Sequence, residues 1–161
     1  MKTLAFRSAT RSGIRFMVLL HSPGEPDLEE WSAYLREVKA MLSLNGELVH
    51  TFVATDGGGP IAAQRKGLAD VIQACVGDLL THVFTRDPFV RGIVTAFRWI
   101  ARSKAVAHTP EEFEQVCAEL GLSPHQVLEV FGEAQRTFTP VETLAQLHKH
   151  TKPKRTSLAR R

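Results

Sequence analysis

The chain lacks long hydrophobic runs and holds few cysteines. Its longest uninterrupted apolar segment, Phe16 to Leu20, has the length of a strand, whereas a membrane-spanning helix needs about 18 apolar residues or more. We therefore expect no membrane span. Cys75 and Cys117 lie in helix-like apolar patterns, which indicate two buried thiols rather than a disulfide framework. A chain of 161 residues buries enough apolar surface to fold without disulfides or metals.

Acidic residues are missing from both ends of the chain. All 17 acids lie between Glu25 and Glu142, whereas residues 1–15 and 149–161 hold ten of the 20 basic residues. The body between these ends keeps ten basic groups against 17 acidic ones, a net charge of −7. A negative body argues against a nucleic-acid-binding surface. Nucleic acid is therefore expected only at the basic tail, where Lys152-Pro153-Lys154-Arg155 resembles a nuclear-localisation or polyanion-binding cluster.

Catalytic signatures are also missing. The sequence contains no Gly-x-Ser-x-Gly nucleophile elbow, no His-Glu-x-x-His and no paired cysteine spacing for zinc. His50 and His82 fall inside expected strands, where satisfied core or edge positions are the favoured interpretation. We assign no catalytic residue, no metal ligand and no cofactor. Enzymatic activity stays an open question, with a non-enzymatic role preferred.

Hydrophobic periodicity predicts strands that alternate with helices. The acid-free start is either a transit peptide or, as we prefer, a β-hairpin with Gly13 near its turn. The alternation that follows implies an α/β fold with a mostly parallel sheet of four or five strands and two C-terminal helices. The expected strands are 3–8, 14–20, 48–54, 79–84 and 105–108, and the expected helices are 27–44, 60–74, 89–101, 110–120 and 124–137.

These elements form one domain over residues 1–137. Residues 138–161 are predicted to contain a weak helix near 141–147 and a disordered basic tail. Helical spacing predicts one buried face for each of the first three helices. The expected faces are Leu28, Trp31, Tyr34, Leu35, Val38, Met41 and Leu42, then Ile61, Leu68, Val71 and Ile72, then Val90, Ile93, Val94, Phe97 and Ile100.

Turns that follow the parallel strands form the candidate binding site, because ligands of open α/β sheets bind at that edge. The turns are residues 21–24, 55–60 and 85–88, and they contain Ser22, the three glycines and Arg86. In the middle turn, residues 55–60, three successive glycines precede a helix whose first position we assign to Pro60. Such a loop can present backbone N–H groups to an anion. It matches neither a P-loop nor Gly-x-Gly-x-x-Gly, and the alternative interpretation is a tight strand–helix turn that a partner's backbone approaches closely.

Polar side chains near these turns complete the candidate set, although each also has a structural interpretation. Gln64 and Arg65 follow on the next helix and fit a solvated helix face equally well. Asp87 fits a helix N-cap, and Arg91 fits a surface group. The predicted ligand- or partner-binding residues are Ser22, Thr55, Asp56, Gly57, Gly58, Gly59, Gln64, Arg65, Arg86, Asp87 and Arg91.

The order of elements over residues 3–137 resembles a STAS domain, the module of anti-sigma-factor antagonists. Ala54-Thr55-Asp56-Gly57 stands where such proteins commonly carry Asp-Ser before the second helix. The resemblance implies a non-enzymatic module that docks on a partner protein through this loop and the helix after it. The position of the family's regulatory serine is Gly57 here, which has no hydroxyl, so Thr55 could replace it in the family's phospho-switch only if the Thr55 hydroxyl points outward.

Three hypotheses on function follow. The first is a regulatory protein-interaction module of STAS-like fold, located in the cytoplasm and with self-association left open. The second is a small α/β enzyme or an anion- or nucleotide-binding domain that uses Asp56, the glycine loop and Arg86. The third is a nucleic-acid-associated protein that acts through its basic tails.

Overall fold

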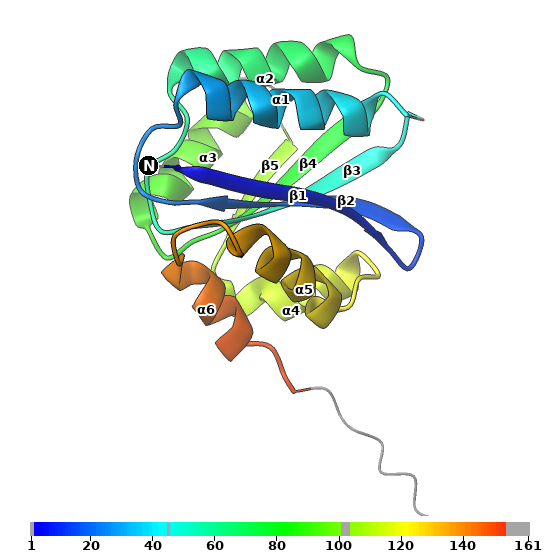
Figure 1. The fold of residues 1–161 in the computed structure, drawn as a ribbon, viewed down its shortest axis with the longest axis vertical. Coiled ribbons are helices and arrows are strands. Elements are labelled where there is room, and N and C mark those ends of the chain that lie inside the picture. The colour runs from blue at the N-terminus through cyan, green and yellow to red at the C-terminus, as the bar shows by residue number, and fades with distance from the viewer. Residues whose placement is uncertain (1, 45, 101–103, 154–161) are drawn as a thin grey trace, which may run out of the picture.

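The computed structural model describes residues 2–44, 46–100 and 104–153. Its centre is a five-stranded sheet in the order β1-β2-β3-β4-β5, in which β1 runs antiparallel to β2 and the other neighbours pair in parallel. The strands are β1 (Leu4–Arg11), β2 (Ile14–His21), β3 (Leu48–Thr55), β4 (Asp78–Phe84) and β5 (Lys104–His108). The predicted α/β fold with an N-terminal hairpin and a mostly parallel sheet is thus confirmed (Figure 1).

The hairpin turns at Ser12 and Gly13, which both have positive φ, 51° and 75°. Positive φ at both central positions is the requirement of a type I′ turn, whose twist matches that of paired strands. Glycine reaches this conformation without a steric penalty, so Gly13 explains why the turn forms where the sequence predicts it.

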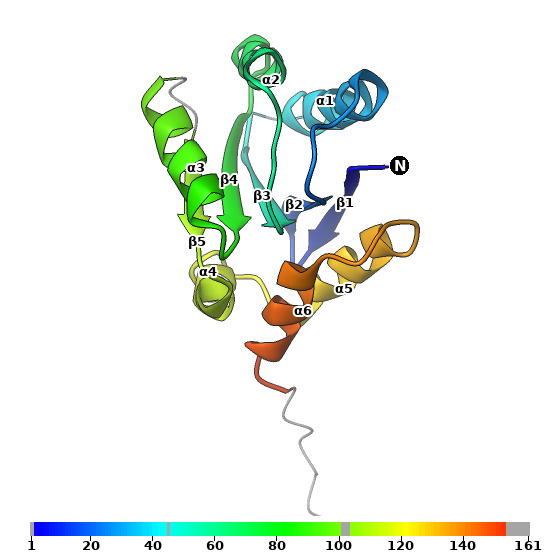
Figure 2. The same cartoon turned by 90° about the vertical axis from the view of Figure 1, so that its left-hand side faces the viewer.

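Helices cover the sheet on both faces, as Figures 1 and 2 show. Because the strand order follows the chain order, right-handed crossovers place the first three helices on one face. These are α1 (Leu28–Leu42), α2 (Ala62–Ala74) and α3 (Pro88–Ile100). After β5 the chain crosses to the other face and forms the 3₁₀ turn η1 (Pro110–Glu112), α4 (Phe113–Glu119), α5 (Pro124–Gln135) and α6 (Glu142–Lys149).

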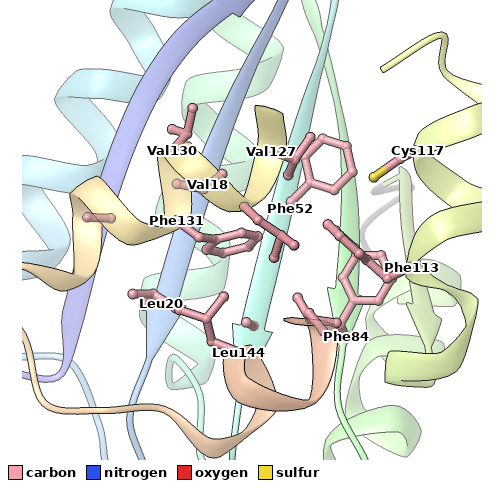
Figure 3. Packing of buried hydrophobic residues seen from close by; sticks show 14 of the residues in the cluster. Val18, Leu20, Phe52, Phe84, Phe113, Cys117, Val127, Val130, Phe131 and Leu144 are labelled. Carbon is pink, nitrogen blue, oxygen red and sulfur yellow. The ribbon is translucent and has the colours of Figure 1, made fainter. Parts of the chain in front are cut away.

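Two hydrophobic cores result, one on each side of the sheet. Strand β2 supplies both, since Val18 points to the face under α4–α6 and Leu19 to the face under α1–α3. Figure 3 shows the first core, in which Phe52, Phe84 and Phe113 lie together. Phe113 contacts the other two rings edge-on at centroid distances of 6.5 and 5.3 Å. Each of these fully buried side chains contributes about 2 kcal/mol by burial alone.

Three details of the predicted helices are wrong. Leu28 is 80% exposed and Ile61 is 43% exposed, although helical spacing assigns both to buried faces. Both stand at helix starts, since Leu28 is the first residue of α1 and Ile61 is the N-cap of α2, and a residue in the first turn is covered by neighbours on fewer sides than one in the middle of a helix. Pro60 is not the first residue of α2, because the helix begins at Ala62 with Ile61 as its N-cap. The side chains of Phe97 and Ile100, expected on the face of α3, and Asn45, expected at the end of α1, lie outside what the structure describes.

Helix α6 belongs to the same body as the rest of the fold. Its Leu144 and Leu147 are buried in the core that contains Phe52 and Phe84. The helix predicted near 141–147 is therefore present, and it packs on the domain that we assigned to residues 1–137. Of the predicted basic tail, residues 154–161 lie outside the described residues. Over the described ranges, every helix is too short or too polar to cross a membrane.

Candidate functional site

Parallel pairing brings the carboxyl ends of β2, β3 and β4 to one edge of the sheet. His21 at the end of β2 pairs in register with Thr55 at the end of β3, and Ala54 pairs with Phe84 at the end of β4. The turns that follow these strands therefore share one edge, which we call the rim. The predicted clustering of the turns after Ser22, Thr55 and Arg86 is present.

Glycine is required at Gly58 for two independent reasons. Its φ is +71°, a left-handed value that other residues rarely adopt, and a Cβ there would lie 2.7 Å from the backbone nitrogen of Gly24. The glycine loop thus packs directly on the turn after β2. A Cβ at Gly57 would lie 3.2 Å from Oδ2 of Asp87, on the turn after β4. The loop is therefore the middle piece of the rim and touches both neighbouring turns.

Asp56 points away from the loop and holds α6. Its Oδ2 accepts the backbone N–H of Glu142 at 2.7 Å, and its Oδ1 accepts that of Thr143 at 2.7 Å. The hydroxyl of Thr143 lies 2.7 Å from the same Oδ1 and 2.9 Å from the carbonyl oxygen of Thr55. Asp56 therefore caps the N-terminus of a helix on the opposite face of the sheet, where a negative charge suits the helix dipole. No local sequence pattern predicts this contact, because Glu142 and Thr143 lie 86 and 87 residues after Asp56.

The candidate residues on α2 also have structural partners. Gln64 accepts the N–H of Ile61 at 3.0 Å and donates to the carbonyl of Pro26 at 2.6 Å. Its own carbonyl accepts the indole N–H of Trp31 at 3.0 Å. Arg65 donates to the carbonyl of Pro60 at 2.6 Å. Gln64 thus joins α1 to α2, and its expected role in binding stays a prediction.

The polar side chains of the turn after β4 contact two different elements. Asp87 caps α3 by accepting the N–H of Phe89 at 2.8 Å, as the sequence predicts. Arg86 forms an exposed ion pair with Glu111 on η1, and the Arg91 side chain is half-buried. Ser22 donates its backbone N–H to Thr3 at 3.0 Å. Asp87 thus contacts α3 and Arg86 contacts η1, so the two side chains do not line one common cleft.

Behind the glycine loop lies a cavity of about 130 Å³ between the sheet and α1–α3. Leu19, Val53 and Val83 form its floor on three neighbouring strands. Further side chains line it from the three helices, and Gly58 and Arg65 line its end at the rim. The helix residues are Trp31, Tyr34, Leu68, Val90, Ile93 and Val94. The cavity is therefore lined mostly by apolar side chains, with polar groups at the rim and Thr81 further along β4, and a mostly apolar lining with a few polar groups is usual in a ligand site.

His21 is the unusual polar residue of this cavity. It is 4% exposed, and its Nδ1 donates to the carbonyl of Gly57 at 3.2 Å, while its Nε2 has no hydrogen-bond partner among the described residues. Burial lowers the pKa of His21, against the opposing effects of the Gly57 carbonyl and of Glu30. The ring is therefore neutral at pH 7, with an acceptor lone pair on Nε2. The sequence signal for this residue is its position at the end of a fully buried strand, next to Ser22.

A row of three histidines crosses the other face of the sheet. Nδ1 of His50 lies 3.2 Å from Nε2 of His82, and Nδ1 of His82 lies 3.2 Å from Nε2 of His108. The rings stack at centroid distances of 5.5 and 5.4 Å. Burial and the two neighbouring rings lower the pKa of His82 to about 4, and burial also lowers the pKa of His50 and of His108. The predicted satisfied positions of His50 and His82 are thus confirmed, as members of a neutral row.

Exposed apolar side chains gather at the rim. Leu28 at the start of α1, Ile61 before α2 and Phe89 in the first turn of α3 are 80, 43 and 72% exposed. All three helices begin after a strand that ends at the rim, so these side chains lie at the same edge of the sheet as the glycine loop. Clustered apolar exposure of this kind is typical of an interaction surface, whereas single exposed apolar residues are ordinary.

Metal ligands do not gather at the rim or elsewhere among the described side chains, since no group of three or more His, Cys, Asp or Glu residues could hold an ion there. In the histidine row, the four ring nitrogens that face one another are taken up by mutual contacts. Comparison of the chain with protein-family models, with curated proteins and with solved structures finds no match.

Proposed function

We propose that this protein is a non-enzymatic, regulatory protein-interaction module of STAS-like fold that docks on its partner through the rim. One observation carries the proposal: Ile61 before α2 and Phe89 in the first turn of α3 stay exposed where these helices begin at the rim. An apolar side chain such as Phe89 loses about 2 kcal/mol of burial energy when it stays in water. A partner that covers it recovers this energy.

The chemistry of the rim indicates the kind of partner. Apolar side chains of the partner would cover Ile61 and Phe89, and its backbone would approach the loop at Gly59, where a Cβ would meet nothing within 4 Å. An acidic side chain would suit the half-buried Arg91 of α3. Aromatic and arginine residues of this sort are the usual anchors of an interface.

The enzymatic alternative has less support. It depends on Asp56 and Arg86 acting together with the glycine loop, yet both oxygens of Asp56 accept hydrogen bonds from α6. Arg86 is paired with Glu111. Catalysis by these groups would require both to leave their present partners. The alternative of a loop-bound anion stays a prediction.

A capture experiment with two matched variants tests the proposal. Gly58 is a poor site for substitution, because any Cβ there collides with the Gly24 backbone. Phe89→Asp instead alters an exposed side chain whose backbone N–H keeps its bond to Asp87. Val76→Asp, at an 83% exposed position between α2 and β4, serves as the control at the opposite edge.

We expect immobilised wild-type protein and Val76→Asp to retain the same protein from the cell extract, and Phe89→Asp to lose it. Removal of one central aromatic anchor lowers affinity by about tenfold or more. Equal capture by all three forms would contradict docking through the rim, and so would the absence of any captured protein. A second copy of the chain is recognised as the partner by sedimentation velocity, with the same two variants.

A further inference from the structure

Strand β1 has one open long side. It stands first in the sheet order, so β2 pairs with one of its sides and no strand of the described residues pairs with the other. Figure 2 shows this open side between α1 on one face of the sheet and α5 on the other. An unpaired edge of eight residues is a ready template for a further strand.

The register of the hairpin shows which backbone groups face the open side. Arg11 pairs with Ile14 across the two-residue turn, and such a closing pair exchanges both of its hydrogen bonds. Bonded and non-bonded pairs alternate along an antiparallel ladder, so every second residue of β1 directs its N–H and C=O groups away from β2. The N–H of Leu4 points outward in this way and donates to Oε1 of Glu30 at 3.3 Å. The further outward N–H groups are those of Phe6, Ser8 and Thr10.

On the side of α5, positive charge borders this edge. A groove of about 350 Å³ lies between β1 and the end of α5, and its lining contains one acid, Glu133, and three basic residues. The basic residues are Lys2, Arg7 and Arg136. The carboxylate of Glu133 is shared, because it lies 2.8 Å from Arg7 and 3.9 Å from Arg11. Basic groups are therefore in excess on this side, and Arg7 and Arg136 are both exposed.

On the side of α1, the edge is apolar and acidic. The half-buried ring of Phe6 packs there against the core under α1. Glu37 of α1 accepts the hydroxyl of Ser8. Glu30, in the first turn of the same helix, accepts the hydroxyl of Thr3 at 2.8 Å. A negative side chain added on this face would meet two carboxylates, so uncharged side chains fit there.

We propose that β1 binds an extended peptide as an additional strand, with acidic side chains on the α5 side and apolar side chains on the α1 side. Because successive side chains of a strand point to opposite faces, such a peptide has an acid at every second position. Strand addition at a sheet edge is a general mode of peptide recognition. A second copy of β1 fits less well, because the strand holds two arginines and no acid, and like charges on paired strands repel. The inference does not depend on docking at the rim.

The probe is an eight-residue peptide of alternating glutamate and valine with both ends capped. One control peptide has lysine in place of glutamate, and another has four glutamates followed by four valines. We expect the wild-type protein to bind the alternating acidic peptide at least about fivefold more tightly than either control in fluorescence anisotropy, which is the effect of one net hydrogen bond or more. Phe89→Asp, which alters the rim, should bind it like the wild type.

Matched variants test the backbone and the charge separately. Thr10→Pro removes an outward N–H and keeps the ladder to β2, so it should lower the affinity for the alternating acidic peptide at least about fivefold, whereas Thr10→Val should retain it. Arg136→Glu should also lower the affinity. Lys149→Glu makes the same change of charge at an exposed position of α6 and should leave the affinity unchanged.

Hydrogen exchange of the wild-type protein covers the case in which Thr10→Pro fails to fold. The bound peptide should slow exchange at the amides of Phe6, Ser8 and Thr10. It should leave the rates at Arg7 and Ala9 unchanged, because the register directs these amides to β2. No binding of the alternating acidic peptide, equal affinity for all three peptides, or protection without this alternation would overturn the proposal. So would an affinity that a folded Thr10→Pro or Arg136→Glu leaves unchanged.

Discussion

Acidification should destabilise this protein through His82. The ring is 6% exposed and lies between His50 and His108, and burial with these two neighbours lowers its pKa from 6.5 to about 4. The unfolded chain therefore binds the proton more readily between these two values. Stability is fully present above pH 6.5 and is lost as the pH falls towards 4. The whole shift corresponds to about 3 kcal/mol, of which about 2 kcal/mol is lost by pH 5.

Urea denaturation of the wild type and of His82→Phe over a series of pH values measures this effect. Phenylalanine retains the stacking on Phe52, whose ring lies 5.5 Å from that of His82, and removes the titrating group. The free energy of unfolding of the wild type should fall by about 2 kcal/mol more than that of the variant between about pH 7 and pH 5. The carboxylates change the free energy of unfolding with pH by the same amount in both proteins, so their contribution cancels in the difference. His148→Phe, which changes an exposed histidine, controls for histidine loss in general. Parallel curves for the wild type and His82→Phe would refute the reasoning.

Three further predictions concern stability and reactivity. Asp56→Ala removes the cap of α6 and should lower the free energy of unfolding, measured in urea, by about 1–2 kcal/mol. Asp56→Asn should have a stability between those of the wild type and Asp56→Ala. An unchanged midpoint of the urea transition would contradict the capping role. Gly58→Ala should lower the free energy of unfolding by about 2 kcal/mol or more. Gly92→Ala, at a position in α3 where a Cβ meets nothing within 4 Å, should raise it by up to about 1 kcal/mol. The melting temperatures of the two variants should therefore move in opposite directions. Burial raises the pKa of the Cys117 thiol to about 12, so a thiol reagent at pH 8 should label the half-buried Cys75 first; equal labelling rates in the native protein would be inconsistent with the buried position of Cys117.

Local patterns were sufficient to predict the fold. The run from Phe16 to Leu20 indicated a strand buried on both faces, and each of its residues is buried. Gly13 predicted the hairpin turn, and Asp87 predicted the start of α3. Such signals lie within a few residues of the structure that they specify, so one sequence is enough to read them. The exposed Leu28 and Ile61 are exceptions, because spacing alone does not show where a helix extends past the sheet.

The candidate site was less readable, because its decisive contacts join distant parts of the chain. Asp56 was predicted to lie beside a bound anion or a partner, whereas its carboxylate caps a helix that follows 86 residues later. The sequence around His21 predicts no special role for it, because nothing next to it shows that Nε2 is buried without a partner among the described residues while Nδ1 reaches Gly57. The alternation of strands and helices indicated the correct edge of the sheet, whereas the contacts of the side chains at that edge could be read only from the tertiary structure.

The bond between Asp56 and the start of α6 has a consequence for synthesis on the ribosome. The loop that carries Asp56 is synthesised first, whereas the backbone N–H groups of Glu142 and Thr143 follow 86 and 87 residues later. At about 5–20 residues per second, that carboxylate waits several seconds for its partners. During this interval the aromatic face with Phe52 and Phe84 also lacks α5 and α6 as its cover. The nascent chain therefore exposes this apolar face of the sheet until the residues of α5 and α6 have been synthesised and can pack on it.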